Sequence, residues 1–215
     1  MQINRAIAIR TWLCIIAAFV AASPAVAADR AALVIGNSDY RHTPKLKNPR
    51  NDATDISASL KRLGFKVVAG YDLTKKAMEA KVWEFSDIAR NADTALLFYS
   101  GHGMQLAGRN YLLPVDARLD KTASVEDETV PFDFIQAILQ VAKKNNIIIL
   151  DACRNNPLRA RYVDTVSRSV GSSAVVGLRP GLAKIGAARA NTIVSFSTQP
   201  DNVALDGAGR NSPYT

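Results

Sequence analysis

The stretch Ile147–Leu150 limits most strongly what this chain can fold into, because four apolar residues run directly into an acid and a cysteine. The turn-forming residues RNNP follow at once. A short apolar run bounded by turn residues is typical of a strand buried on both faces, and such strands belong to parallel sheets covered by helices. Cys153 is therefore predicted to lie just past the carboxyl end of a central strand, at the edge where α/β sheets bind ligands.

The rest of the chain alternates between apolar runs and amphipathic segments. We predict strands at Ala31–Gly36, Phe65–Ala69, Thr94–Tyr99 and Asn191–Thr198, helices at Asn51–Leu63, Thr74–Ala89 and about Phe132–Lys144, and a hairpin-like segment at Asn110–Ala117. Strands that alternate with helices favour a mainly parallel sheet covered on both faces. A chain of 215 residues is long enough for one such α/β domain with a full core.

The first 27 residues differ in composition from the rest. Arg5 and Arg10 precede a short apolar stretch, and an Ala-Val-Ala step ends at Ala27. This order is typical of a secretory signal peptide, so we expect residues 28–215 to be exported, periplasmic or secreted, without stable membrane association after cleavage. An uncleaved membrane anchor is the alternative, but the apolar stretch is shorter than the ~20 residues that a spanning helix needs.

Removal of this segment changes the charge and the thiol count. The formal charge falls from +8 by two, and the basic residues that remain lack interleaved aromatic side chains. No nucleic-acid partner is therefore expected. Cys14 is lost as well, which leaves Cys153 as the only thiol and excludes a disulfide framework. A single free thiol in an exported protein is a chemical liability that usually has a use.

Residues 158–190 interrupt the α/β pattern. They are rich in glycine, serine, alanine and basic residues, and they form a longer connection than most ordered ones. We predict a mobile linker here, followed by the strand at Asn191–Thr198. No helix is predicted between that strand and Thr215, so the sequence is expected to be either a fragment or an early-terminating form.

His102 is placed in the same way as Cys153, because the strand at Thr94–Tyr99 ends in the sequence SGHG. The flanking Gly101 and Gly103 permit a sharp turn and a close approach of a substrate. An imidazole beside a thiol lowers the thiol pKa and protonates the departing amine. At matching strand ends and 51 residues apart, His102 and Cys153 form a candidate cysteine hydrolase dyad.

Each of these residues taken alone has a plainer interpretation, as a small core residue or a core histidine. His42 lies in the polar stretch DYRHTPKLKN and is expected to be a loop residue. With two histidines and one cysteine in the mature chain, a zinc site lacks ligands at a recognisable spacing.

Five blocks of sequence, ALVIGNSDY, LKNPRNDA, LLFYSGHGM, NYLLPVDA and IIILDACRNNP, resemble the caspase-type clan of cysteine peptidases, most closely bacterial metacaspase-like members. The resemblance covers roughly residues 30–213. Caspases in general carry their histidine about 50 residues before the cysteine. The resemblance implies a three-layer α/β/α sandwich with a mainly parallel central sheet, and an endopeptidase in which Cys153 attacks the scissile carbonyl and His102 handles the proton.

The resemblance also implies an oxyanion hole formed by the N–H groups of Gly103 and Cys153. This chemistry needs no cofactor. Calcium activates many metacaspases, but the sequence contains no calcium-loop pattern of carboxylates. The partners implied are protein or peptide substrates, and the oligomeric state is left open.

Specificity is expected to differ from that of animal caspases, which have a glutamine where this sequence has Asp151. Metacaspases carry an acid there and another in the NDA stretch, which matches Asp52. Two carboxylates lining a pocket favour lysine or arginine before the cleaved bond, because a buried cation needs paired charge. The alternative is that Asp52 only stabilises the helix start, where acids are favoured anyway.

The strand VSFST resembles the family segment on which an extended substrate pairs edge to edge, so Ser195 and Ser197 are candidate substrate-binding residues. The linker before it contains basic residues that the enzyme's own specificity could cleave: Arg159, Arg161, Arg168, Arg179, Lys184 and Arg189. Two other functions remain open. One is a non-catalytic regulatory or partner-binding module, and the other is a sibling peptidase of legumain or gingipain type.

Overall fold

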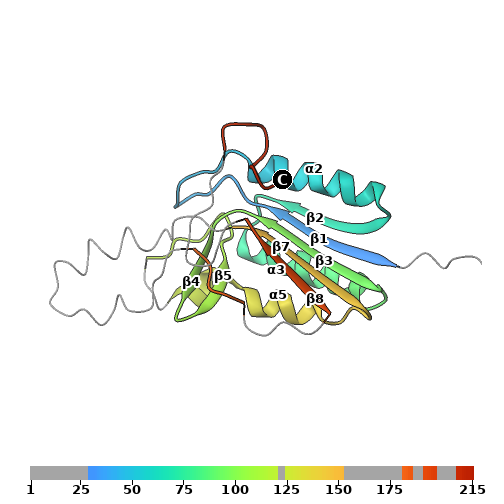
Figure 1. Cartoon of the computed structure of the whole chain (residues 1–215). Coiled ribbons are helices and arrows are strands. Elements are labelled where there is room, and N and C mark those ends of the chain that lie inside the picture. Colours follow the sequence, from blue (N-terminus) through green and yellow to red (C-terminus); the bar gives the residue numbers. More distant parts are fainter. Residues whose placement is uncertain (1–28, 121–123, 153–180, 186–190, 198–206) are drawn as a thin grey trace, which may run out of the picture.

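The computed structural model describes residues 29–120, 124–152, 181–185, 191–197 and 207–215. In chain order the elements are β1 (Arg30–Gly36), α2 (Pro49–Arg62), β2 (Phe65–Tyr71), α3 (Lys75–Ala89), β3 (Thr94–Ser100), β4 (Gly103–Leu106), β5 (Arg109–Leu112), α4 (Val125–Glu128), β6 (Val130–Pro131), α5 (Phe132–Leu139), β7 (Asn145–Asp151) and β8 (Thr192–Phe196). Figure 1 shows them arranged in three layers, with the main sheet in the middle.

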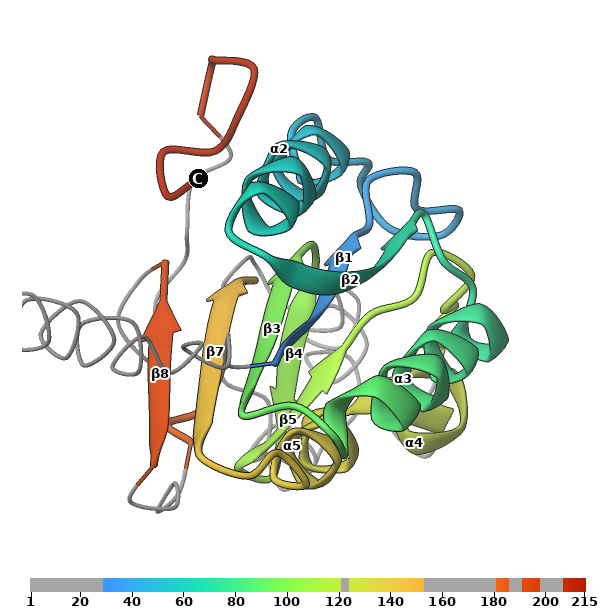
Figure 2. The same cartoon turned by 90° about the vertical axis from the view of Figure 1, so that its right-hand side faces the viewer.

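The main sheet has the strand order β2-β1-β3-β7-β8, and every neighbouring pair is parallel. Helix α2 covers one face, and α3 and α5 cover the other (Figure 1). Figure 2 shows β8 at one edge of the sheet, beside β7. The prediction of a mainly parallel sheet in a three-layer α/β/α sandwich is confirmed.

Burial on both faces explains why the strand sequences are continuously apolar. In β1, Ala32 and Val34 belong to the apolar cluster beneath α2. Leu33 and Ile35 belong to the larger cluster that includes residues of α3 and α5. Because successive side chains of a strand point to opposite faces, a strand with helices on both sides needs apolar residues at every position.

Gly36 allows α2 to begin close to the carboxyl end of β1. A Cβ atom at this position would lie 2.3 Å from the carbonyl oxygen of Pro49, so no other residue fits without displacing backbone. The helix starts at Pro49, two residues before the predicted start. Proline suits the first turn of a helix, because the N–H group that it lacks would have no partner within the helix there. This close approach brings Asp52, in the first turn of α2, to the carboxyl edge of the sheet.

A second, antiparallel sheet of strand order β4-β5-β6 lies at that edge. The predicted hairpin was displaced: its strands are β4 and β5, and the turn is Ala107–Gly108, where both residues have positive φ angles of 51° and 80°. Paired positive φ angles suit the tight turns that match strand twist. Residues 113–117 instead leave the sheet, and the Val115 amide donates to the Leu73 carbonyl.

The helix predicted to reach Lys144 ends at Leu139. The chain then turns, and the Lys143 and Lys144 amides donate to the carbonyls of Ala92 and Asp93 just before β3. These bonds align the start of β7 with the start of β3, so a longer helix is incompatible with the pairing of the two strands.

Two short segments near the end of the sequence pack on the domain. Of the predicted linker, the structure describes residues 181–185, in which Leu182 is fully buried and the Ala183 backbone exchanges two hydrogen bonds with the Asn110 amide. Residues 158–180 and 186–190 lie outside the described part of the chain. Residues 207–215 lie beside α2 (Figure 2).

Candidate active site

His102 lies directly after β3, at the carboxyl edge of the main sheet, and its side chain is buried. The preceding residue, Gly101, donates its amide to the Asp151 carbonyl at 3.2 Å. Because β3 and β7 are paired in parallel, with Ser100 opposite Asp151, the ends of these two strands lie side by side at the edge of the sheet.

Two tyrosine hydroxyls hold the backbone of His102. The Tyr40 hydroxyl accepts the His102 amide at 2.7 Å, and the Tyr99 hydroxyl donates to the His102 carbonyl at 2.7 Å. The Tyr40 ring also packs against the imidazole, with ring centroids 4.5 Å apart. Buried main-chain groups need such partners, so both hydroxyls fix where the histidine lies.

The imidazole of His102 is oriented by the Pro44 carbonyl, which lies 2.8 Å from Nε2. A carbonyl can only accept, so in the neutral ring Nε2 carries the proton and Nδ1 carries the lone pair. A histidine fixed in this tautomer can take a proton at Nδ1. This arrangement suits a general base.

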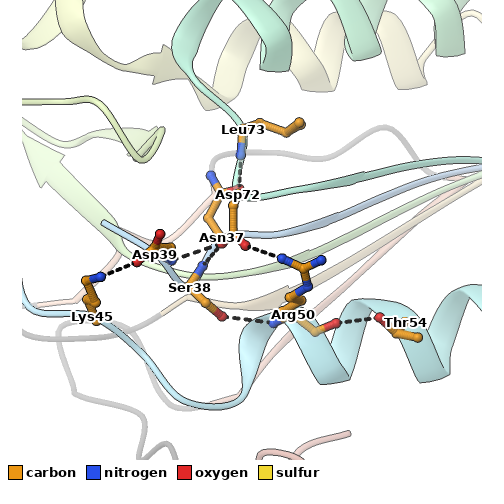
Figure 3. A network of polar contacts seen from close by, with 8 residues as sticks. All are labelled: Asn37, Ser38, Asp39, Lys45, Arg50, Thr54, Asp72 and Leu73. Carbon is orange, nitrogen blue, oxygen red and sulfur yellow. Dashed lines mark hydrogen bonds and ion pairs between the residues drawn. The ribbon is translucent and has the colours of Figure 1, made fainter. Parts of the chain in front are cut away.

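A polar network holds the loop that carries Tyr40 and Pro44 (Figure 3). Asp72 is at its centre. One carboxylate oxygen accepts hydrogen bonds from the amides of Ser38 and Asp39 at 2.7 and 2.9 Å, and the other accepts one from the Arg50 guanidinium at 3.0 Å. The Ser38 hydroxyl in turn accepts the Arg50 amide in the first turn of α2. The network therefore joins this loop to α2 and to the end of β2.

Asn37, the residue after β1, makes two further side-chain hydrogen bonds beside this network. Its side-chain oxygen accepts the Leu73 amide at 3.0 Å, and its side-chain nitrogen donates to the Leu113 carbonyl at 3.0 Å. Asn37 is fully buried, so both of its polar groups are satisfied at the edge of the sheet.

Cys153 and its sulfur lie outside the described residues, as does any contact that it makes with His102. Ala152, the residue before it, is buried. A Cβ atom built on Gly103 would lie 2.8 Å from the Ala152 carbonyl oxygen, so the segment after His102 and the segment before Cys153 are in close contact. Only glycine fits at position 103. The oxyanion hole expected of Gly103 and Cys153 stays a prediction.

Asp52 and Asp151 are both fully buried, and Ser212 bridges them. The Ser212 amide donates to Asp52 Oδ1 at 2.9 Å, and the Ser212 hydroxyl donates to Asp151 Oδ2. The Ser100 hydroxyl donates to the other oxygen of Asp52 at 3.1 Å. The structure therefore brings together the two acids that the sequence singled out, together with two serines that it did not.

In the part of the chain that the structure describes, little positive charge surrounds these two acids. Neither has an ion-pair partner among the residues that the structure describes, and Oδ1 of Asp151 is buried without a hydrogen bond there. Burial, followed by the nearby Asp151 charge, raises the pKa of Asp52, against the lowering effect of the hydrogen bonds from Ser212 and Ser100. Two buried carboxylates in this setting attract a cation, because a buried charge is costly unless it is paired.

Ser195 and Ser197, the predicted substrate-binding residues, lie at the edge strand β8 and just after it. The Ser195 hydroxyl contacts the Tyr214 hydroxyl of the C-terminal segment. The Ser197 amide donates to the Leu150 carbonyl, which extends the pairing with β7. Their role in binding a peptide stays a prediction.

Two other features are absent from the described part of the chain. No three histidine, cysteine, aspartate or glutamate side chains are gathered as they are in a metal site. No helix there has the length and apolarity needed to cross a membrane.

Several residues of the site were missed from sequence. Tyr40 lies in the loop after β1 and Tyr99 lies in the apolar strand β3. Aromatic residues in such stretches usually belong to the core, and nothing in the sequence marks their hydroxyls as partners of His102. Ser100 is the first residue of the SGHG sequence, and its position at a strand end is a signal that could have identified it. Ser212 lies 160 residues from Asp52, and no local pattern connects them.

Comparison with known families agrees with this fold. The model of the caspase domain of peptidase family C14 matches residues 29–215. The chain belongs to the caspase domain family. It is therefore a member of a cysteine peptidase family, and the predicted caspase-type resemblance is confirmed.

Three relatives illustrate the range of this family. The human mucosa-associated lymphoid tissue lymphoma translocation protein 1 is 36% identical over 146 residues, which is 66% of this chain and 16% of that protein. Bovine caspase-13 is 26% identical over 134 residues, 58% of this chain and 33% of that protein. Porcine caspase-1 is 24% identical over 184 residues, 81% of this chain and 44% of that protein. The chain thus spans less than half the length of each.

Among solved structures, the crystal structure of protein GSU0716 from Geobacter sulfurreducens matches with a TM-score of 0.54 at 16% identity. The match covers 86% of this chain and 78% of that one. At this identity the likeness concerns the fold, and it agrees with the three-layer arrangement described above.

Proposed function

We propose that this caspase domain is a cysteine endopeptidase in which His102 and Cys153 form the catalytic dyad, and that it cleaves after arginine or lysine. The observation that carries the dyad is the register of β3 and β7. Ser100 lies opposite Asp151, and His102 and Cys153 each follow two residues later in the sequence. The contact of Gly103 with Ala152 supports the same placement.

In the proposed mechanism, Nδ1 of His102 takes the thiol proton of Cys153 while Nε2 stays bonded to the Pro44 carbonyl. The thiolate attacks the scissile carbonyl carbon, and the N–H groups of Gly103 and Cys153 donate to the oxyanion. The imidazolium then gives its proton to the departing amine, which leaves an acyl-enzyme thioester. Water, deprotonated by His102, hydrolyses the thioester and restores the thiol.

Asp52 and Asp151 are proposed to select the basic residue. Both carboxylates are buried at the same edge as His102 and lack a cation among the described residues. A substrate guanidinium or ammonium supplies the missing positive charge through charge-assisted hydrogen bonds, whereas a substrate carboxylate is repelled. The same carboxylates argue against cleavage after aspartate.

The test is hydrolysis of arginyl, lysyl, asparaginyl and aspartyl reporter peptides by purified protein. We expect turnover of the arginyl and lysyl peptides, and a loss of at least about 10²–10⁴-fold in the variants Cys153→Ala and His102→Ala. His42→Gln, at the other histidine, is the matched control and retains turnover. Absence of turnover of all four peptides would favour the regulatory module, and a preference for asparagine would favour the legumain-type sibling.

The remaining predictions concern processing, location and cofactors. We propose that residues 1–27 direct export and that the domain needs no cofactor for peptide hydrolysis. The NDA and NYLLPVDA blocks support a metacaspase-like subtype, for which calcium activation is testable by adding calcium or a chelator to the peptide assay. Self-cleavage within residues 158–190 predicts fragments in wild-type protein that Cys153→Ala lacks.

A further inference from the structure

The C-terminal segment, residues 207–215, is attached to an exposed face of α2 next to the acid pair. The Arg210 guanidinium donates from Nε and Nη2 to the two oxygens of Asp55, each at 3.1 Å. The Asn211 side chain donates to the same carboxylate at 2.9 Å. Asp55 therefore receives three N–H donors from two consecutive residues.

The same segment makes two further bonds close by. The Asn51 side chain donates to the Arg210 carbonyl at 2.9 Å, and the Lys47 ammonium donates to the Ala208 carbonyl at 2.9 Å. Asn51 and Asp55 are four residues apart, so they lie on one face of α2. This face binds both the side chain and the backbone of Arg210.

The residues held in this way lead directly to Ser212, the bridge between Asp52 and Asp151. Ser212 follows Arg210 by two residues, so fixing Arg210 on α2 limits where the Ser212 amide and hydroxyl can lie. Asp52 is on the same helix as Asp55, one turn earlier. Helix α2 therefore carries both an acid of the pocket and the site that positions the donor to that acid.

The charge of Arg210 is used on Asp55 and not on the buried acids. Hydrogen bonds from Arg210 and Asn211, the largest effects, lower the pKa of Asp55. Asp52 shows the opposite shift, and among the described residues the neighbours that set it are Ser212, Ser100, Asp151 and Thr215, none of them basic. The guanidinium thus anchors the segment through Asp55, and neither it nor another described basic residue pairs with the acid pair.

We infer that Asp55 is a positioning residue for the basic-residue pocket, which acts through Arg210 and Ser212 on Asp52 and Asp151. Asp55 itself does not contact the substrate. An exposed ion pair alone contributes little, but a bidentate arginine pair combined with an amide on the same carboxylate has defined geometry. The consequence for substrate binding depends on the proposed function; the attachment of the segment does not.

The first experiment compares Asp55→Ala and Arg210→Ala with wild type on arginyl reporter peptides. We expect KM to rise about tenfold while kcat changes less than about twofold, because substrate binding is weakened but the dyad is unchanged. The double variant Asp55→Arg with Arg210→Asp restores the pair with reversed charges and recovers most of the lost affinity. Asp87→Ala, which removes an exposed acid paired with Arg90 on α3, is the matched control and leaves KM unchanged.

The second experiment does not depend on activity. Backbone hydrogen exchange of residues 207–215 is measured in Cys153→Ala protein with and without Asp55→Ala. We expect exchange about tenfold faster in the Asp55→Ala protein, and recovery in the charge-reversed pair. Unchanged exchange overturns the inference, whether or not the protein cleaves peptides.

The kinetic outcomes separate this inference from the proposed function. If wild type cleaves no peptide but the exchange result holds, the endopeptidase proposal fails and the positioning of the segment stands. If wild type cleaves arginyl peptides and Asp55→Ala has an unchanged KM, the positioning role fails. A lower KM in Asp55→Ala also overturns it, because the segment then covers the pocket.

Discussion

The surroundings of His102 and of the acid pair differ in which part of the fold supplies their supports. Tyr40 and Pro44 follow β1, Tyr99 is in β3, and all three bind the histidine through main-chain groups or through the ring nitrogen. Asp52 and Asp151 depend on Ser212, which lies 160 and 61 residues away.

This difference separates the proposed catalytic base from the proposed pocket for a basic residue. The histidine is fixed by buried hydroxyls and a carbonyl that belong to the central sheet and its first loop. The acids are joined by one small residue of a segment whose attachments to α2 are exposed. We therefore expect substitutions to alter the choice of substrate more easily than the geometry of the proposed base, and the predictions that follow test this contrast.

The largest effect is expected for Asp52→Asn. If a substrate cation pairs with the buried acids, loss of one charge costs about 3–5 kcal/mol of that interaction, or about 10²–10⁴-fold in kcat/KM. The measurement is the ratio of kcat/KM for arginyl and uncharged citrullyl reporter peptides. That ratio falls in Asp52→Asn and stays at the wild-type value in Asp87→Asn. An unchanged ratio in both variants would remove Asp52 from the pocket.

Tyr40→Phe is the corresponding test of the histidine. The variant keeps the ring against the imidazole but leaves the buried His102 amide without the hydroxyl, at a cost of about 1–3 kcal/mol in the free energy of unfolding. We expect kcat to fall with little change in KM. Tyr71→Phe, which keeps its ring beside Arg50, is the control. Urea denaturation measures the stability, and equal stabilities of the two variants would contradict the role of Tyr40.

A smaller effect is expected from Asp72→Asn, which weakens the network in Figure 3 without removing it. The amide oxygen still accepts one or two of the bonds from Ser38, Asp39 and Arg50, but the charge that strengthens them is lost. We expect a loss of about 1 kcal/mol in the free energy of unfolding and a modest fall in kcat. Asp93→Asn, at an acid paired with Lys144 far from the loop, measures the background effect on kcat.

The smallest effect concerns pH. Burial raises the pKa of Asp52 above its ordinary value of 3.8, so between that value and the folded-state pKa the native state binds more protons than the unfolded state. The contribution of Asp52 to stability is therefore present below the unfolded value and is lost as pH rises through the folded-state pKa. Asp52→Asn abolishes this part of the loss. Parallel pH profiles of stability for wild type and Asp52→Asn would contradict the assignment.

The strand ends could be predicted from sequence because burial on both faces leaves a continuous apolar run. The runs before His102 and Cys153 marked the sheet edge, and the NDA block marked Asp52. The hairpin was displaced because its turn uses Ala107 in a left-handed conformation that alanine seldom adopts. The support from Ser212 could not be predicted, because a bond between two polar residues far apart leaves no periodic signal.

The pairing of β3 with β7 has a consequence for changes in chain length. Each residue of β3 lies opposite the residue 51 positions later, the same interval that separates His102 from Cys153. The hydrogen-bonded ladder, and not the length of the intervening chain, sets the alignment of the two strand ends. An insertion at the exposed Gly108 turn leaves that alignment intact. A single-residue deletion inside β7 shifts the register of the strand, which moves the side chains on one side of the deletion to the opposite face of the sheet. The segment after Asp151 is then no longer aligned with His102.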